Sequence, residues 1–275
     1  ADVCFQTLWM GSSKVESILR DPRVAAATLT GSEPAGRSVA AIAGDEVKHT
    51  VLELGGSDPY IVMPSADIAQ AAKTAVTARV QNNGQSCIAA KRFIVHTDVY
   101  DEFVDAFTEG FRSLVVGDPT DEATDVGPLA TEQGRTDLEE LVDDAVGKGA
   151  KVLIGGSRVD RPGWFYEPTI LADCPEGSEI LTEEVFGPVV AVDSLDLDIA
   201  DGPVPVLTWV TSTIDRLLLE TGRPAADLAG IGIGLPGPVE HSTGRAINPP
   251  IMPGWDGYDV PGHVQRAFDV SRRAG

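Results

Sequence analysis

Residues 80–93 read VQNNGQSCIAAKRF and hold a cysteine, Cys87, in a short polar turn. Gly84, Gln85 and Ser86 come directly before the sulfur, and the apolar run after it predicts a strand. A cysteine used only for packing usually lies inside a continuous apolar run, whereas this one is placed where its sulfur can be reached. A half-buried structural cysteine remains the ordinary interpretation of a lone cysteine. Motifs elsewhere in the chain must decide between a reactive and a structural cysteine.

The chain of 275 residues is long enough for one large or two medium domains with cores of their own. Its formal net charge is −21, and the 42 acidic residues are spread over many segments. This charge would repel the phosphates of nucleic acid, so we expect no nucleic-acid partner. No apolar run is long enough to span a bilayer, and we expect no membrane partner.

The cysteines and histidines are few and scattered. Three cysteines (Cys4, Cys87 and Cys174) do not make a disulfide framework, which suits a reducing cytoplasm, and we predict a cytoplasmic protein. None of the four histidines stands at metal-ligand spacing from a cysteine, so no metal site is predicted.

A strand predicted over residues 24–29 runs into the turn Thr30-Gly31-Ser32-Glu33-Pro34-Ala35-Gly36, and a helix is expected over residues 36–43. Free backbone N–H groups and the helix dipole make such a turn suitable for binding an anion such as a phosphate. Glycine and serine are also common in turns simply because the chain must bend, and this turn alone leaves both interpretations open.

The next predicted strand, residues 49–54, carries Glu53 between two leucines, directly before Gly55 and Gly56. A desolvated carboxylate at a strand end would be suited to act as a general base. The alternative is a glutamate that points to solvent from an edge strand.

The remaining pattern alternates strands and helices, which predicts an α/β fold with a largely parallel sheet. Phe103, Phe107 and Phe111 stand four residues apart and predict one buried face of a helix. We expect strands at residues 60–63, 89–96, 151–154 and 164–171, helices at 66–80, 99–116 and 131–147, and a strand at 1–10.

Six short motifs follow one another along the chain. They are Thr30-Gly31-Ser32, Glu53-Leu54-Gly55-Gly56, Gly84-Gln85-Ser86-Cys87, Gly127-Pro128-Leu129, Glu167-Pro168-Thr169 and Glu184-Val185-Phe186-Gly187-Pro188. Cys87 follows Glu53 by 34 residues and precedes Glu184 by 97. In these motifs, their order and their separations, residues 1–192 resemble the aldehyde dehydrogenase family. The segments LELGGSDP and QNNGQSC most resemble its bacterial succinate-semialdehyde dehydrogenase branch.

The resemblance implies an aldehyde dehydrogenase-like catalytic domain and a small-molecule aldehyde as its substrate. It implies that Cys87 attacks the aldehyde carbonyl and that Glu53 activates the water that hydrolyses the resulting thioester. The backbone N–H of Cys87 would then be one donor to the oxyanion.

The same resemblance implies a cofactor, NAD or NADP. Ser32 would contact the pyrophosphate, Glu184 the nicotinamide ribose, and the backbone of Leu54 the nicotinamide, with Phe186 beside it. The cofactor-binding residues implied in this way are Thr30, Gly31, Ser32, Gly36, Leu54, Glu184 and Phe186. Glu53 and the sulfur of Cys87 are expected to face one cleft, with the cofactor side at Ser32 and Glu184.

The chain also departs from the family pattern. The second oxyanion donor and the lysine that binds the adenosine ribose would precede Ala1, so a truncated cofactor-binding part and impaired activity are expected. Ser57 stands where a lysine often follows the two glycines. Gln81 stands where succinate-semialdehyde enzymes often carry an arginine for the substrate carboxylate. The aldehyde and the choice between NAD and NADP therefore stay open.

After Val192 this resemblance ends at an acidic stretch with two prolines, DSLDLDIADGPVPVL. We expect a linker over residues 193–203 and few contacts between the parts on its two sides. Residues 204–275 are expected to form a small α/β lobe with a helix at 206–219 and a strand at 230–235.

This second part resembles the N-terminal lobe of the ROK family of sugar kinases and repressors over about residues 196–268. The segments GLPGPV at 234–239 and NPPIMPGW at 248–255 carry the likeness. The phosphate loop, the catalytic aspartate segment and the zinc motif of that family are missing, so no sugar kinase chemistry is expected.

Two classes of function follow. The first is an NAD(P)-dependent aldehyde dehydrogenase, impaired by truncation. The alternative is a non-catalytic composite of two incomplete domains, or a sugar-binding ROK-like remnant. Aldehyde dehydrogenases form oligomers, but the oligomerisation segment of the family is not found in this sequence.

Overall fold

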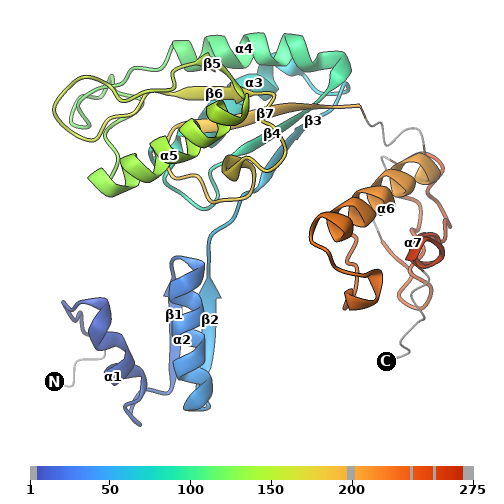
Figure 1. Cartoon of the computed structure of the whole chain (residues 1–275), viewed down its shortest axis with the longest axis horizontal. Coiled ribbons are helices and arrows are strands. Elements are labelled where there is room, and N and C mark those ends of the chain that lie inside the picture. Colours follow the sequence, from blue (N-terminus) through green and yellow to red (C-terminus); the bar gives the residue numbers. More distant parts are fainter. Residues whose placement is uncertain (1–4, 197–201, 236–237, 250–251, 269–275) are drawn as a thin grey trace. The chain divides into compact units, whose positions relative to one another are not determined.

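The computed structural model describes residues 5–196, 202–235, 238–249 and 252–268 (Figure 1). The chain divides into two compact units, Ala1–Leu195 and Asp196–Gly275. Within the described ranges, no helix has both the length and the apolar surface needed to cross a membrane.

The first unit is built around a five-stranded sheet in the order β3-β4-β7-β6-β5 (Figure 1). Its strands are β3 (Pro59–Val62), β4 (Arg92–His96), β5 (Lys151–Ile154), β6 (Thr169–Ala172) and β7 (Val189–Leu195). The pairs β3–β4, β4–β7 and β7–β6 are parallel, and only β5 runs antiparallel to its neighbour β6. The largely parallel sheet predicted from the sequence is therefore confirmed.

Helices cover both faces of this sheet, and the two-residue period of the strands supplies a core to each face. On one face, Ile170 and Val190 pack with α3 (Ile68–Val80) and α4 (Tyr100–Arg112). On the other, Leu171 packs with α5 (Glu132–Lys148). The predicted stripe of phenylalanines on α4 is confirmed as core, because Phe103, Phe107 and Phe111 are all buried.

A smaller element precedes this sheet in the same unit. Strands β1 (Ala26–Thr30) and β2 (His49–Glu53) pair in parallel, with Thr30 opposite Glu53. They are joined by α2 (Glu33–Asp45), which follows the short helix α1 (Val15–Leu19). Helix α2 begins three residues before the predicted start, since Pro34 in its first turn has the backbone angle that a helix start needs.

The second unit contains α6 (Pro203–Glu220) and α7 (Val260–Phe268). Among its described residues, four buried ones pack into a small hydrophobic cluster: Leu207, Met252, Trp255 and Val260. The helix predicted at residues 206–219 is present and is longer by a few residues.

Two of the predicted strands are wrong. Residues 5–10 have no regular secondary structure and are exposed, and no described strand pairs with them; residues 1–4 of that prediction lie outside the described residues. Residues 230–235 likewise form no strand. Three glycines alternate in that segment, and glycine offers a strand neither a side chain to pack nor a restricted backbone. The predicted linker at 193–203 lies partly outside the described residues.

The buried aromatic stripe gives a test of the fold. Phe107 is completely buried and its ring lies 4.8 Å from the rings of both Phe93 and Phe111. We expect Phe107→Ala to lower the free energy of unfolding by about 3–5 kcal/mol, because it leaves a cavity in the core. Phe5→Ala, at an exposed position, is the control and should change it by less than about 0.5 kcal/mol. Urea unfolding followed by circular dichroism measures both, and equal effects would contradict this description of the core.

Candidate functional site

The turn that carries Cys87 has an unusual backbone. It follows α3, and Asn82 and Asn83 there adopt the left-handed conformation, with φ of 50° and 57°. Asparagine tolerates this region better than most residues, so the chain reverses direction sharply at the end of the helix. The result is an exposed thiol at Cys87, whereas Cys174 is buried.

The side chains of the turn tie it to the loop that contains Gly127, Pro128 and Ala130. Asn83 accepts a hydrogen bond from the N–H of Gly127 at 2.9 Å and donates one to the carbonyl of Pro128 at 3.3 Å. Gln85 accepts one from the N–H of Ala130 at 2.9 Å. The Cys87 turn is thus tied to the loop that contains the Gly127-Pro128-Leu129 motif.

Arg79 holds the same turn from inside the protein. Its side chain is completely buried at the end of α3 and donates to the carbonyls of Gly84 at 2.8 Å, Val185 at 2.9 Å and Gly187 at 2.9 Å. It also donates to Ala90 at 3.0 Å. Burial lowers the pKa of Arg79 to about 9, which leaves the guanidinium charged at neutral pH. The cation therefore joins the turn to the loop at residues 185–187.

Lys91 is a second buried cation under the turn. Its amine donates to the carbonyl of Cys87 at 2.9 Å, of Ala89 at 3.1 Å and of Ser86 at 3.4 Å. Burial, followed by the charge of Arg79, lowers the pKa of Lys91 below its ordinary value. Among the described residues, no carboxylate lies within ion-pair distance of this amine.

A hollow of about 830 Å³ lies between the start of α2, the end of β2 and the loop at residues 182–184. Four of the residues implied by the family resemblance line it: Ser32, Gly36, Leu54 and Glu184. Ser32 stands at the N-terminus of α2, and its side chain makes no capping hydrogen bond. The N-terminus of a helix of this length attracts anions such as phosphates.

Two glycines keep the walls of this hollow close. A Cβ atom on Gly55 would lie 2.4 Å from a carboxylate oxygen of Glu184, and one on Gly36 would lie 2.6 Å from Leu54. The N–H of Gly56 donates to Glu184 at 3.3 Å. The structure thus brings Glu184 against the pair of glycines after β2, although Gly56 lies 128 residues away in the sequence.

The other predicted site residues are placed differently. Glu53 is exposed, which favours the second interpretation, a glutamate that points to solvent from an edge strand. Strand β2 has only β1 beside it among the described strands, and it alternates exposed and half-buried residues. Gly31 donates its N–H to the carbonyl of Glu53 at 3.0 Å. Phe186 is 44% exposed. Neither Cys87 nor Glu53 lines the hollow, and a single cleft shared by the two stays a prediction.

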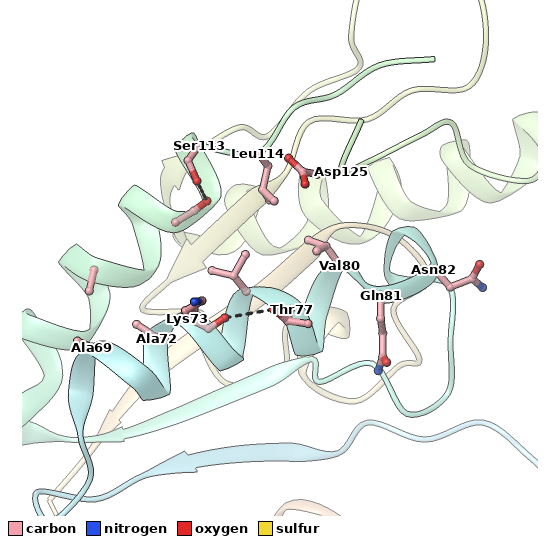
Figure 2. Close-up of a pocket in the computed structure, with 13 residues that line it drawn as sticks. Ala69, Ala72, Lys73, Thr77, Val80, Gln81, Asn82, Ser113, Leu114 and Asp125 are labelled. Atoms are coloured by element: carbon pink, nitrogen blue, oxygen red, sulfur yellow. Dashed lines mark hydrogen bonds between the residues drawn. The ribbon is translucent and has the colours of Figure 1, made fainter. Parts of the chain in front are cut away.

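A second hollow, of about 650 Å³, runs along α3 toward the Cys87 turn (Figure 2). Lys73, Thr77 and Gln81 lie on the α3 side, and Ser113 and Asp125 lie across from them (Figure 2). Gln81 is the position noted from the sequence as a departure from the arginine of succinate-semialdehyde enzymes. This hollow therefore ends at the turn that carries the thiol.

Arg79 and Lys91 were not singled out from the sequence, although a signal exists for the first. Ala72, Ala75 and Arg79 follow one another at intervals of three and four on the buried face of α3. A charged residue at a core position of a helix needs hydrogen-bond partners, and this pattern predicts that Arg79 has a buried polar role.

Comparisons with known proteins identify the family of the chain. Residues 4–201 match the Aldehyde dehydrogenase family, and the chain belongs to that family. It is 71% identical over 189 residues to a succinate-semialdehyde dehydrogenase [NADP(+)] of Mycobacterium avium, covering 69% of this chain and 40% of the relative. It is 68% identical over 191 residues to succinate-semialdehyde dehydrogenase [NADP(+)] 1 of Mycobacterium tuberculosis, covering 70% and 42%.

A solved structure is similar over the same region. The succinic semialdehyde dehydrogenase of Streptococcus pyogenes, in complex with NADP+, aligns with a TM-score of 0.67 and 37% identity. The alignment covers 69% of this chain and 42% of that one. The chain thus spans about two fifths of the length of the relatives that it matches.

The buried guanidinium gives a second test. Arg79→Met removes the guanidinium donors from the carbonyls of Gly84, Val185 and Gly187, which lie away from water. Among the described residues, the carbonyl of Val185 then has no other donor, whereas the other two keep one backbone N–H donor each. We expect the free energy of unfolding to fall by about 3–5 kcal/mol. Arg112→Met, at an exposed position on α4, should change it by less than about 0.5 kcal/mol. Thermal and urea unfolding would show this difference; similar values for the two variants would mean that Arg79 does not hold the turn.

Proposed function

We propose that this chain acts as an NADP-dependent aldehyde dehydrogenase, with succinate semialdehyde as the first substrate to test. The observation that carries the proposal is an exposed thiol, Cys87, on a turn that two buried cations fix from beneath. The names of the relatives from Mycobacterium avium and Mycobacterium tuberculosis support the cofactor and the substrate.

In the proposed reaction, the thiolate of Cys87 adds to the aldehyde carbon, and the electron pair of the carbonyl moves to its oxygen. That oxygen receives a hydrogen bond from the backbone N–H of Cys87. NADP, when bound, would supply the oxidising chemistry of the reaction as a hydride acceptor. Glu53 then takes a proton from the water that attacks the thioester, which releases the acid and restores the thiol.

The first hollow fits a dinucleotide. It begins at the N-terminus of the 13-residue helix α2, where backbone N–H groups and the hydroxyl of Ser32 favour a pyrophosphate. At its other end Glu184, held by Gly56, would accept hydrogen bonds from the hydroxyls of the nicotinamide ribose. Three further cofactor residues of the proposal do not line this hollow but are close in sequence to residues that do: Thr30, Gly31 and Phe186.

The second hollow is proposed as the approach of the aldehyde to Cys87. It leads along α3 to Gln81 and Asn82, at the start of the turn (Figure 2). Among the described residues, Lys73 is the one cation in the lining of this hollow, and its charge would attract the carboxylate of a semialdehyde. Gln81 could donate to the same group through its amide.

The second unit carries the alternative proposal. If residues 196–268 are a ROK-like lobe, the chain is a composite of two parts and need not be catalytic. The division into two units and the separate cluster around Trp255 are compatible with that alternative. The two proposals differ in whether the chain oxidises an aldehyde through Cys87. A measurement of dehydrogenase activity on the whole chain therefore separates them.

The test is formation of NADPH from succinate semialdehyde and NADP, followed by absorbance. Cys87→Ser should reduce the rate by on the order of 1,000-fold or more, because oxygen is a poor replacement for the thiolate nucleophile. Glu53→Gln should reduce steady turnover while leaving the first round of NADPH formation, since it acts on the thioester. Cys174→Ser is the matched control and should retain the activity.

Labelling with iodoacetamide provides a readout independent of the cofactor. Cys87 should react much faster than Cys174, since burial raises the pKa of the Cys174 thiol to about 11. Cys4 lies outside the described residues and serves as an internal reference. Absence of NADPH formation together with equal labelling of Cys87 and Cys174 would rule out the proposed dehydrogenase.

A further inference from the structure

The contacts of Lys91 fix the direction of two peptide planes in the Cys87 turn. The carbonyl of Ser86 accepts from the N–H of Ala89 at 3.0 Å and from the Lys91 amine at 3.4 Å. The carbonyl of Cys87 accepts from the same amine at 2.9 Å. Because Lys91 is completely buried, both carbonyl oxygens point into the protein.

A trans peptide is planar, and its N–H points away from its C=O. The described chain contains no cis peptide. The N–H of Cys87 shares a plane with the carbonyl of Ser86, and the N–H of Ile88 shares one with the carbonyl of Cys87. Both N–H groups therefore point away from Lys91, and neither donates to another atom of the described residues. They are free donors beside an exposed sulfur.

We propose that Lys91 is a positioning residue that aims the N–H of Cys87 at the oxygen of a substrate carbonyl. The proposal rests on the proposed role of Cys87 as the nucleophile and adds to it the device that orients the oxyanion donor. When the sulfur–carbon bond forms, the π electron pair of the carbonyl moves to oxygen, and the fixed N–H donates to it without transferring its proton.

A lysine suits this position better than a neutral residue. Its charge-assisted hydrogen bonds to carbonyls are stronger than neutral ones, and three donors reach three oxygens at once. No carboxylate among the described residues forms an ion pair with it, so its donors go to the turn alone. The cost of burying the charge is thus spent on the orientation of the backbone next to Cys87.

Two reactions of the same sulfur separate this role from a purely structural one. Acylation by p-nitrophenyl acetate passes through a tetrahedral oxyanion, whereas alkylation by iodoacetamide displaces iodide from a saturated carbon and forms no oxyanion. Removing an oxyanion donor costs about 100- to 1,000-fold in rate. An effect through the Cys87 N–H therefore lowers acylation and spares alkylation.

The experiment compares Lys91→Met with the wild-type chain in both reactions. The burst of p-nitrophenolate gives the acylation rate, and mass spectrometry of the Cys87 peptide gives the alkylation rate. We expect acylation to fall by about 100-fold or more and alkylation to change by less than about threefold. Lys91→Gln keeps amide donors on a shorter side chain, so its acylation rate should lie between those of Lys91→Met and the wild-type chain. Lys151→Met replaces an exposed lysine and should leave both rates unchanged.

The outcomes are distinct. Equal losses in both reactions, or the failure of both Lys91 variants to fold by circular dichroism, would assign Lys91 to the stability of the turn and overturn the proposal. Ester cleavage that persists in Cys87→Ser would instead remove the nucleophile itself, and the positioning role with it. Three results together support the proposal. Lys91→Met loses acylation but keeps alkylation, Cys87→Ser loses ester cleavage, and Lys151→Met keeps both rates.

Discussion

The guanidinium of Arg79 is the interaction on which the arrangement of the site depends. It joins carbonyls of the Cys87 turn to those of Val185 and Gly187, which follow it by 106 and 108 residues. A buried cation without a carboxylate partner costs several kcal/mol unless its N–H groups are used. The two segments therefore have to keep their carbonyls turned inward, and Lys91 adds the same constraint one turn further along. The thiol is exposed because the backbone beneath it is held.

The same constraint links the two halves of the proposed site. Glu184 directly precedes Val185, whose carbonyl accepts a hydrogen bond from Arg79. The carboxylate of Glu184 accepts a hydrogen bond from the N–H of Gly56 at the edge of the first hollow. A change in the Arg79 contacts would thus shift both the Cys87 turn and the Glu184 wall of the first hollow.

The motifs and hydrophobic periods predicted much of this. The parallel sheet, the phenylalanine stripe on α4 and the family followed from the sequence, because burial and motif spacing are local properties of the pattern. The roles of Arg79 and Lys91 did not follow from the sequence. Their hydrogen-bond partners include carbonyls that only the folded chain brings together. The exposure of Glu53 depends on which strand lies beside β2, and the strand expected at 230–235 depends on packing that glycines cannot provide.

Hydrogen–deuterium exchange of the whole chain, wild type against Arg79→Lys, tests the central claim most directly. Lysine keeps the charge but cannot reach all the carbonyls that the guanidinium spans. The account predicts that amides at residues 84–91 and at 185–192 lose protection together, while those of α5 (Glu132–Lys148) keep theirs. Loss of protection confined to the end of α3, with residues 185–192 unchanged, would contradict it.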